Sequence, residues 1–177
     1  MELELSESII LNKFLLEEDE CDKFIEIYNS EIKYDLDHLG GLRRYCQIIV
    51  PDEIINKITN LLSAYMVVKK IDSIGKIHHT VQGGIKEHTD YAFYDEKLKS
   101  NSKYTLVIYL SSTEDGIGKT KIKRLKTRTF EDEISDYKHE RVAITPKKGY
   151  SVMFNHNLLH CAEDSYGDKY ILVLRVY

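Results

Sequence analysis

His88 and Asp90 are the residues whose types and spacing most directly suggest chemistry in this sequence. They stand two apart at the end of the run 83–90, Gly-Gly-Ile-Lys-Glu-His-Thr-Asp. On an extended strand, residues i and i+2 point to the same face, so an imidazole and a carboxylate would converge on one point. One further histidine would complete a set of two His and one carboxylate, which leaves three coordination positions open and suits non-haem Fe(II). The alternative is a solvated His and Asp at a strand end.

Several other histidines could supply the third ligand. His156 and His160 share parity on a straight strand, so either could face the metal. His78 and His79 are adjacent and would face opposite ways, which favours one buried and one solvated ring. The histidines without supporting context are His38 and His139.

An ordered series of motifs gives the His-x-Asp pair a context. In chain order these are His88-Thr89-Asp90, Thr105–Tyr109–Leu110, Gly149–Phe154, His160 and, nine residues later, Lys169. The sequence resembles the Fe(II)/2-oxoglutarate-dependent oxygenases of the prolyl 4-hydroxylase-like group. That group shows His-x-Asp, then Thr-x-x-x-Tyr-Leu, Gly-x-x-x-x-Phe, a distal His, and a Lys or Arg nine or ten residues further on. A short apolar segment (Ile9 to Phe14) before an acidic, Cys-containing helix is a further similarity, so the resemblance covers essentially the whole chain.

The resemblance implies a metal site made of His88, Asp90 and His160, which would bind Fe(II). The spacing to the following cation favours His160 over His156, which becomes a core or neighbouring residue. Because a carboxylate occupies the position that halogenating relatives leave open for chloride, the resemblance implies hydroxylation rather than chlorination.

The resemblance also implies a cosubstrate site for 2-oxoglutarate. Its C5 carboxylate would be buried, and a buried carboxylate requires a cation and hydrogen bonds. Lys169 would supply the charge and the Tyr109 hydroxyl a second bond. Arg175 is a rival cation on the same face, but it lies about 20 Å further along an extended strand, so only one can serve.

The expected reaction couples decarboxylation of 2-oxoglutarate by O2 to hydroxylation of a C–H bond, with ascorbate as the reductant. The ending Lys169-Tyr170-Ile171-Leu172 is most similar to prolyl 4-hydroxylases, which implies a prolyl residue in a peptide or protein as substrate. Tyr91, with Phe93 and Tyr94, would line the substrate groove. Arg44 lies in a stretch that relatives use near the substrate entrance.

The chain departs from the family pattern at two places. Relatives carry a tyrosine nine or ten residues before the first metal ligand, where this chain has His78-His79-Thr80. Relatives also often carry Gly-Gly-x-Thr after the Tyr109 strand, where this chain has the altered run 116–120, Gly-Ile-Gly-Lys-Thr. Both departures concern the substrate pocket and leave the metal ligands intact.

Other functions were weighed against this one. A same-superfamily enzyme could act on a free amino acid or a nucleic acid, and a jelly-roll module could bind without catalysis. The stretch Lys119–Arg128 has six basic residues in ten, but it has no aromatic residue to stack on bases, so a solvated hairpin is favoured. Nucleic-acid demethylases of the superfamily carry several arginines after the distal histidine, whereas this chain has only Arg175 there.

The elements that must position these residues follow from local patterns. The acidic start of about Glu17 to Asn29 suits a helix dipole, and Pro51-Asp52-Glu53 announces a second helix. Short β-branched and aromatic runs then predict strands at Lys76–Val81, Tyr104–Ser111, Arg141–Thr145, Tyr150–His156 and Lys169–Tyr177. The charged stretch 116–137 fits a long loop or a projecting hairpin. We therefore expect an α+β chain with a double-stranded β-helix (jelly roll) of about eight strands. It would form one domain over 1–177, in which 1–73 is mainly helical support and 74–177 is the jelly-roll core.

Composition sets the broad class. The 177 residues include 25 basic and 29 acidic side chains, which disfavours a nucleic-acid-binding protein. Three cysteines at no paired spacing argue against a disulfide framework. The start has no signal-peptide plan, and no apolar run reaches the ~18 residues of a membrane span. A soluble, intracellular protein is expected, and nothing in the sequence indicates an oligomeric state.

Overall fold

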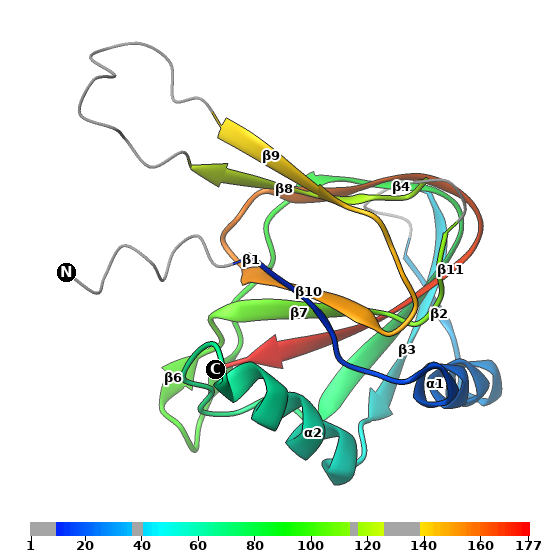
Figure 1. Cartoon of the computed structure of the whole chain (residues 1–177). Helices are drawn as coiled ribbons and strands as arrows, with labels where there is room; N and C mark the ends of the chain where they lie inside the picture. The colour runs from blue at the N-terminus through cyan, green and yellow to red at the C-terminus, as the bar shows by residue number, and fades with distance from the viewer. Residues whose placement is uncertain (1–9, 37–40, 114–116, 126–138) are drawn as a thin grey trace, which may run out of the picture.

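Two helices and an antiparallel sheet make up the chain in a computed structural model, which describes residues 10–36, 41–113, 117–125 and 139–177 (Figure 1). In chain order the elements are β1 (Ile10–Phe14), α1 (Glu18–Ser30), β2 (Tyr34–Asp35), β3 (Leu42–Ile49), α2 (Asp52–Ser63), β4 (Ile74–His88), β5 (Tyr94–Asp95), β6 (Ser100–Asn101), β7 (Tyr104–Tyr109), β8 (Thr120–Leu125), β9 (His139–Ile144), β10 (Tyr150–Asn155) and β11 (His160–Val176). Both predicted helices are confirmed to within a residue or two.

The two helices form where the sequence satisfies their first turns. At the start of α1 the Glu20 carboxylate accepts a hydrogen bond from the Glu17 N–H at 2.7 Å, which occupies a donor that has no partner within the helix. Three acidic residues in that turn also suit the helix dipole. In α2 the buried residues recur at helical spacing, at Ile54, Ile58 and Leu62. Each helix therefore has one apolar face to place against the sheet.

The sheet is rolled into two layers. Its strand order is β1-β10-β7-β11-β4-β3-β2, and β8 pairs with both β11 and β9. Strand β11 runs through both layers, because it pairs with β8 over His160–Ala162 and with β7 over Ile171–Val176. Strand β4 does so as well, because it pairs with β11 from His88 to Lys76. In Figure 1 the strands β8 and β9 lie above β1, β10 and β7, and both helices lie below. The expected double-stranded β-helix with flanking helices is confirmed.

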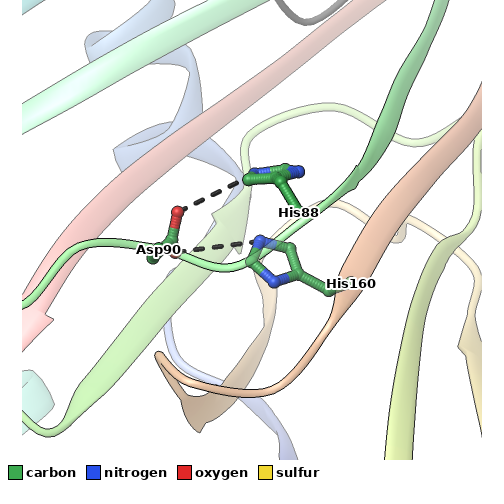
Figure 2. Close-up of side chains that lie close together, drawn as sticks. All are labelled: His88, Asp90 and His160. Atoms are coloured by element: carbon green, nitrogen blue, oxygen red, sulfur yellow. Dashed lines mark ion pairs between the residues drawn. The ribbon is translucent and has the colours of Figure 1, made fainter.

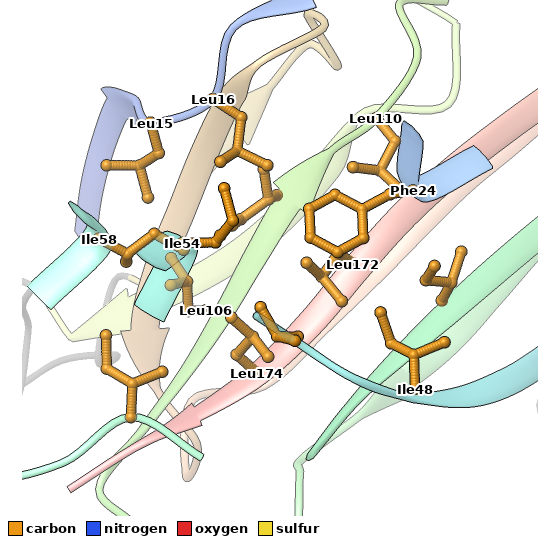
Figure 3. Close-up of a cluster of buried hydrophobic side chains, with 14 of the residues drawn as sticks. Leu15, Leu16, Phe24, Ile48, Ile54, Ile58, Leu106, Leu110, Leu172 and Leu174 are labelled. Carbon is orange, nitrogen blue, oxygen red and sulfur yellow. The ribbon is translucent and has the colours of Figure 1, made fainter. Parts of the chain in front are cut away.

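Strand β7 separates two hydrophobic cores, and all six of its residues are buried. Leu106 and Ile108 face the helices and join the larger core, which Figure 3 shows with Leu15, Phe24 and Leu172 among its members. The alternate residues of β7 face the interior between the layers, where the smaller core lies. The alternation explains why β7 reads as a continuous apolar run, as expected for a strand covered on both faces.

The N-terminal part of the chain does more than support the sheet with helices. Strand β1 pairs with β10, and β3 pairs with β4 from Leu42 to Ile49. Besides its two helices, this part of the chain therefore also supplies the edge strands β1 and β2 of the sheet. The predicted Ile9–Phe14 strand and the five strands predicted from Lys76 onwards are present with shifted ends.

The charged stretch 116–137 is described only in part. Strand β8 begins at Thr120, and residues 126–138 lie outside the described residues. Of the basic residues in this stretch, Lys121 forms an ion pair with Glu163, and Lys123 pairs with Glu87 at 2.8 Å. Those two lysines are therefore neutralised by the sheet itself. His38 also lies outside the described residues. No helix in the described ranges is long and apolar enough to cross a membrane.

Gly149 offers a test of the fold. Its φ is +79°, and a Cβ there would come within 2.2 Å of the Leu16 carbonyl oxygen. We expect Gly149→Ala to lower the free energy of unfolding by about 2–4 kcal/mol, measured by urea denaturation. Gly167→Ala is the matched control, because Gly167 also has a positive φ but its Cβ would meet no atom within 4 Å. Equal losses in both variants would contradict this account of Gly149.

Candidate metal centre

The pairing of β4 with β11 brings the two predicted histidine ligands together. His88 is the last residue of β4, and it lies directly opposite His160, the first residue of β11. Asp90 follows just beyond the end of β4, where its backbone N–H donates to the His156 carbonyl at 3.0 Å. The expectation that His88 and Asp90 share one strand is thus corrected, because a loop anchored to the His156 backbone aims the carboxylate.

The three side chains converge on one point (Figure 2). Asp90 faces both rings from one side: Oδ1 is 3.8 Å from His88 Nε2, and Oδ2 is 3.8 Å from His160 Nε2. One ligand atom from each residue lies within 4.8 Å of the other two. Such spacing leaves room for an ion in contact with all three.

The hydrogen bonds of both histidines keep Nε2 available for a metal. His88 Nδ1 lies 2.8 Å from the Lys86 carbonyl oxygen, and His160 Nδ1 lies 2.9 Å from the Leu158 carbonyl oxygen. A carbonyl only accepts, so Nδ1 carries the hydrogen and Nε2 retains its lone pair. Each ring is therefore oriented by the carbonyl two residues before it.

The Asp90 carboxylate is held by two residues on neighbouring strands. Thr105 of β7 donates to Oδ2 at 2.6 Å, and Arg175 Nη1 of β11 lies 3.2 Å from the same oxygen. Thr105 and Arg175 are themselves opposite each other in the β7–β11 ladder, and Arg175 Nη1 donates to Thr105 Oγ1 at 2.6 Å. Burial raises the pKa of Asp90, but His160, Thr105 and Arg175 together outweigh it, so the pKa lies below its usual value. The group is thus an anion at neutral pH.

The donor set fits a divalent metal of the Fe(II) type. Burial lowers the pKa of His160, which keeps its ring neutral and able to coordinate. Two neutral imidazoles and one carboxylate on one side of a point leave the other side open, as a metal that must also bind small ligands requires.

The centre opens into a cavity of about 410 Å³ between the two layers. All three candidate ligands line it, and so does Lys169. Lys169 is only 5% exposed, and its ammonium donates to the Gly118 carbonyl at 2.6 Å. Burial lowers the pKa of Lys169 to about 8, with a further contribution from Arg43. Among the described residues no carboxylate forms an ion pair with Lys169, so the cavity contains a buried cation suited to an anionic ligand.

The other predicted site residues differ in where they lie relative to the cavity. Tyr109 is fully buried behind the cavity wall, and its hydroxyl donates to Thr120 Oγ1 at 2.8 Å, so Thr120 is the hydroxyl that lines the cavity. Tyr91 lies at the cavity rim and is 85% exposed. Arg44 does not line the cavity. It points to the outer face and pairs with Asp35 at 3.1 Å.

Sequence reasoning missed several cavity residues that strand alternation places there. Arg43, not Arg44, faces the cavity from β3, because Cys46 and Ile48 on the other face belong to the helix-side core. By the same alternation Lys76 and His78 face the cavity from β4. The period-2 pattern of these strands was the available signal, since it identifies the apolar face. His156 is buried beside the centre, and it does not line the cavity.

Comparisons with solved structures find the same fold in other proteins. A viral collagen prolyl hydroxylase from Paramecium bursaria Chlorella virus-1, solved with 2OG, is 19% identical with a TM-score of 0.63, over 94% of each chain. A prolyl hydroxylase from Trichoplax adhaerens, solved with a hypoxia inducible factor peptide, is 14% identical with a TM-score of 0.67, over 99% of this chain and 85% of that one. The alpha-ketoglutarate-dependent epimerase SnoN of nogalamycin biosynthesis is 11% identical with a TM-score of 0.61, over 94% and 78%.

These likenesses define the fold. This chain has the jelly-roll fold of the 2OG-Fe(II) oxygenases, with prolyl hydroxylases among its structural neighbours. The resemblance inferred from the sequence motifs is thereby confirmed at the level of the fold. No family model matches the chain, and no curated protein matches it in sequence.

The metal centre can be tested by binding alone. We expect Asp90→Ala to weaken binding of Fe(II), Co(II) or Zn(II) by about 100-fold or more, because it removes the only anionic ligand of the set. Thr105→Val should weaken binding by roughly 10-fold, because it frees one oxygen of a ligating carboxylate from its orienting bond. Isothermal titration under anaerobic conditions measures both.

The control is Asp168→Ala, which removes an exposed carboxylate outside the cavity. Asp168 Oδ1 lies 2.7 Å from His79 Nε2. Its metal affinity should equal that of the unmodified protein. Unchanged affinity in Asp90→Ala would show that the three side chains do not form the metal site.

Proposed function

We propose that this protein is an Fe(II)- and 2-oxoglutarate-dependent dioxygenase that hydroxylates a C–H bond. The observation that carries the proposal is one cavity with His88, Asp90 and His160 converging in its wall and the buried cation Lys169 in the same interior. A metal site and an anion site within one enclosed space are what an iron enzyme with a dicarboxylate cosubstrate needs.

In this proposal His88, Asp90 and His160 hold the iron, and O2 and 2-oxoglutarate are the cosubstrates. Bound iron would supply the oxidising power for attack on an unactivated C–H bond. The residues of the chain would position the ligands and exclude water. Thr105 and Arg175 fix the carboxylate, the Lys86 and Leu158 carbonyls fix the rings, and the two layers of the sheet exclude water. Ascorbate is proposed as the reductant that keeps the metal divalent.

Lys169 is proposed to bind the C5 carboxylate of 2-oxoglutarate. Its backbone position at the start of the straight part of β11 sets it apart from Arg175, whose guanidinium is engaged with Asp90. Thr120 lines the cavity and accepts a bond from Tyr109, so its own hydroxyl hydrogen is available for a ligand. We therefore assign the second hydrogen bond to the Tyr109–Thr120 pair, with Tyr109 acting through Thr120.

The proposed substrate is a prolyl residue in a peptide or protein. Two structural neighbours are prolyl hydroxylases, and one of them was solved with a peptide. The rim of the cavity carries the exposed aromatic residues Tyr91 and Phe93, which suit a Pro-rich chain that is already near its bound conformation. The epimerase SnoN has the same fold, so this assignment rests on the site and its rim rather than on the fold.

A nucleic-acid substrate is disfavoured by the structure of the basic stretch. Lys121 and Lys123 are engaged with Glu163 and Glu87, and they offer little net charge to a phosphate backbone. A binding module without catalysis differs from an oxygenase in one respect: it releases no succinate from 2-oxoglutarate.

The proposed reaction is tested by incubating the iron-loaded protein with 2-oxoglutarate, ascorbate and proline-rich peptides. We expect succinate release and a gain of one oxygen on proline, detected by mass spectrometry. His160→Ala should abolish both, because it removes a proposed ligand. Turnover of a free amino acid or nucleobase with no peptide oxidised would overturn the prolyl assignment and leave the oxygenase reaction standing.

Lys169 gives a second test, which needs no turnover. With Zn(II) in place of iron, Lys169→Ala should weaken 2-oxoglutarate binding about 100-fold or more while metal binding persists, because a buried carboxylate loses its cation. The affinity of the unmodified protein should also fall above about pH 8, approaching tenfold per pH unit, because the pKa of Lys169 is about 8 and only the ammonium form attracts the ligand.

Lys97→Met, which removes an exposed lysine outside the cavity, is the control and should leave the affinity unchanged. A larger loss in Arg175→Ala than in Lys169→Ala, with metal binding intact, would identify Arg175 as the cosubstrate cation instead.

A further inference from the structure

We propose that the substrate carries a carboxylate close to the carbon that reacts, and that Lys76 and Arg175 bind it. The inference deepens the proposed function and rests on it, since it names the chemical class that the substrate must belong to. It begins from Lys76, which neither the metal site nor the cosubstrate site uses, and from Arg175, whose described hydrogen bonds in the metal site use Nη1 alone.

Lys76 and Arg175 are neighbours on the cavity face of the two longest strands. Lys76 of β4 pairs with Val173 of β11, and Arg175 is the next residue of β11 on the same face. The two residues are thus diagonal neighbours across the ladder, and long side chains at such positions can reach a common small group. Arg175 also touches Asp90 at 3.2 Å, so this pair of cations lies beside the metal centre.

Lys169 belongs to a different part of the cavity. It is six residues before Arg175 on β11, a backbone distance of roughly 20 Å on an extended strand. One dicarboxylate that binds the metal and Lys169 therefore leaves Lys76 without an anion.

The charges of the cavity do not balance when metal and cosubstrate are bound. With Arg43 left aside, its described lining contains the cations Lys76, Lys169 and Arg175 and the anions Asp90 and Glu163. Glu163 is already paired with Lys121. A divalent metal and 2-oxoglutarate carry equal and opposite charge, so together they leave the positive excess in place. Within the described part of the chain, no acidic side chain forms an ion pair with Lys76.

Aromatic rings hold both cations at the mouth. The Lys76 ammonium lies 5.3 Å from the centre of the Tyr45 ring, and the Arg175 guanidinium carbon lies 5.0 Å from the centre of the Phe93 ring. Stacking on a ring engages the face of a guanidinium and leaves its edge donors free. The described bonds of Arg175 all use Nη1. Its remaining N–H groups and the Lys76 ammonium form a receptor for a planar carboxylate.

His78 lines the same wall of the cavity. Burial lowers the pKa of His78 to about 3, and Arg43 and Lys76 lower it further, whereas Asp90 opposes them. His78 is therefore neutral and adds no positive charge to that of Arg43, Lys76 and Arg175.

The carboxylate can come from an acidic side chain beside the target prolyl residue or from the C-terminus of a short peptide. Both present the same group, so the test separates them by design. Four matched peptides carry Glu, Gln or Lys before the proline with blocked ends, or Gln before a proline with a free C-terminal carboxylate.

Binding is measured by fluorescence anisotropy on the Zn(II)- and 2-oxoglutarate-loaded protein. We expect at least one carboxylate peptide to bind about tenfold more tightly than the blocked Gln peptide, and the preference to shrink at high salt. Lys76→Met should remove the preference, and Lys76→Glu should reverse it towards the Lys peptide. Lys97→Met, outside the cavity, should retain it. Whichever carboxylate peptide binds more tightly identifies the source.

A second readout distinguishes failure of this inference from failure of the proposed reaction. Equal binding of all four peptides by the unmodified protein and by Lys76→Glu would overturn the carboxylate receptor, even if proline is hydroxylated. A carboxylate preference that depends on Lys76, without succinate release from any peptide, would support the receptor and overturn the assignment of a prolyl peptide as the substrate. Arg175 variants are left out of the comparison because Arg175 also positions Asp90.

Discussion

The register between β4 and β11 is the constraint on which the rest of the site depends. It sets His88 opposite His160, Thr80 opposite Lys169, and Val173 opposite Lys76. A shift of one residue would turn every cavity side chain of one strand towards the helices, and the helix-side residues Leu172 and Leu174 into the cavity. The larger core therefore protects the site, because burying these leucines against α1 and α2 fixes which face of β11 looks inward. Hydrophobic burial thus decides which face of β4 and β11 carries His88 and His160, and the polar contacts then orient the ligand atoms.

The interior of the roll contains buried polar and charged side chains, and nearby groups form hydrogen bonds or ion pairs with them. Asp90 has Thr105 and Arg175, and each histidine has a carbonyl two residues before it. Lys169 is the exception, since its described partner is only a neutral carbonyl. A buried ammonium of this kind is costly in the free protein and becomes favourable when an anion arrives. The charged groups of the cavity are thus in place before its ligands bind. The negative charge that the cavity lacks indicates that a ligand is an anion.

The sequence predicted the elements that depend on local patterns and missed the relations that depend on pairing. Both helices and the strands that carry the motifs followed from periodicity, caps and turn signals, and His88, Asp90 and His160 converge as expected. The position of Asp90 was misjudged, because its aim comes from a bond to the His156 backbone, 66 residues away. Sequence reasoning chose Arg44, because no local signal distinguishes it from the adjacent Arg43. Only the burial of Cys46 and Ile48 on the opposite face shows that Arg43 faces the cavity. The bond between Thr105 and Arg175 likewise needs the β7–β11 register, which no local signal contains.

The long separation between paired strands has a consequence for how the centre forms. His88 and His160 come from strands that meet only after the intervening 71 residues have been arranged, and Thr105 and Arg175 are equally distant in sequence. Pairings of this kind are slow to form, because the entropy of closing a long loop is lost before the contacts compensate it. No fragment with native helices and hairpins alone would assemble the ligand set. Binding of a metal ion by the proposed ligand set would therefore report completed folding, and it would distinguish the native roll from compact intermediates that already contain much of its secondary structure.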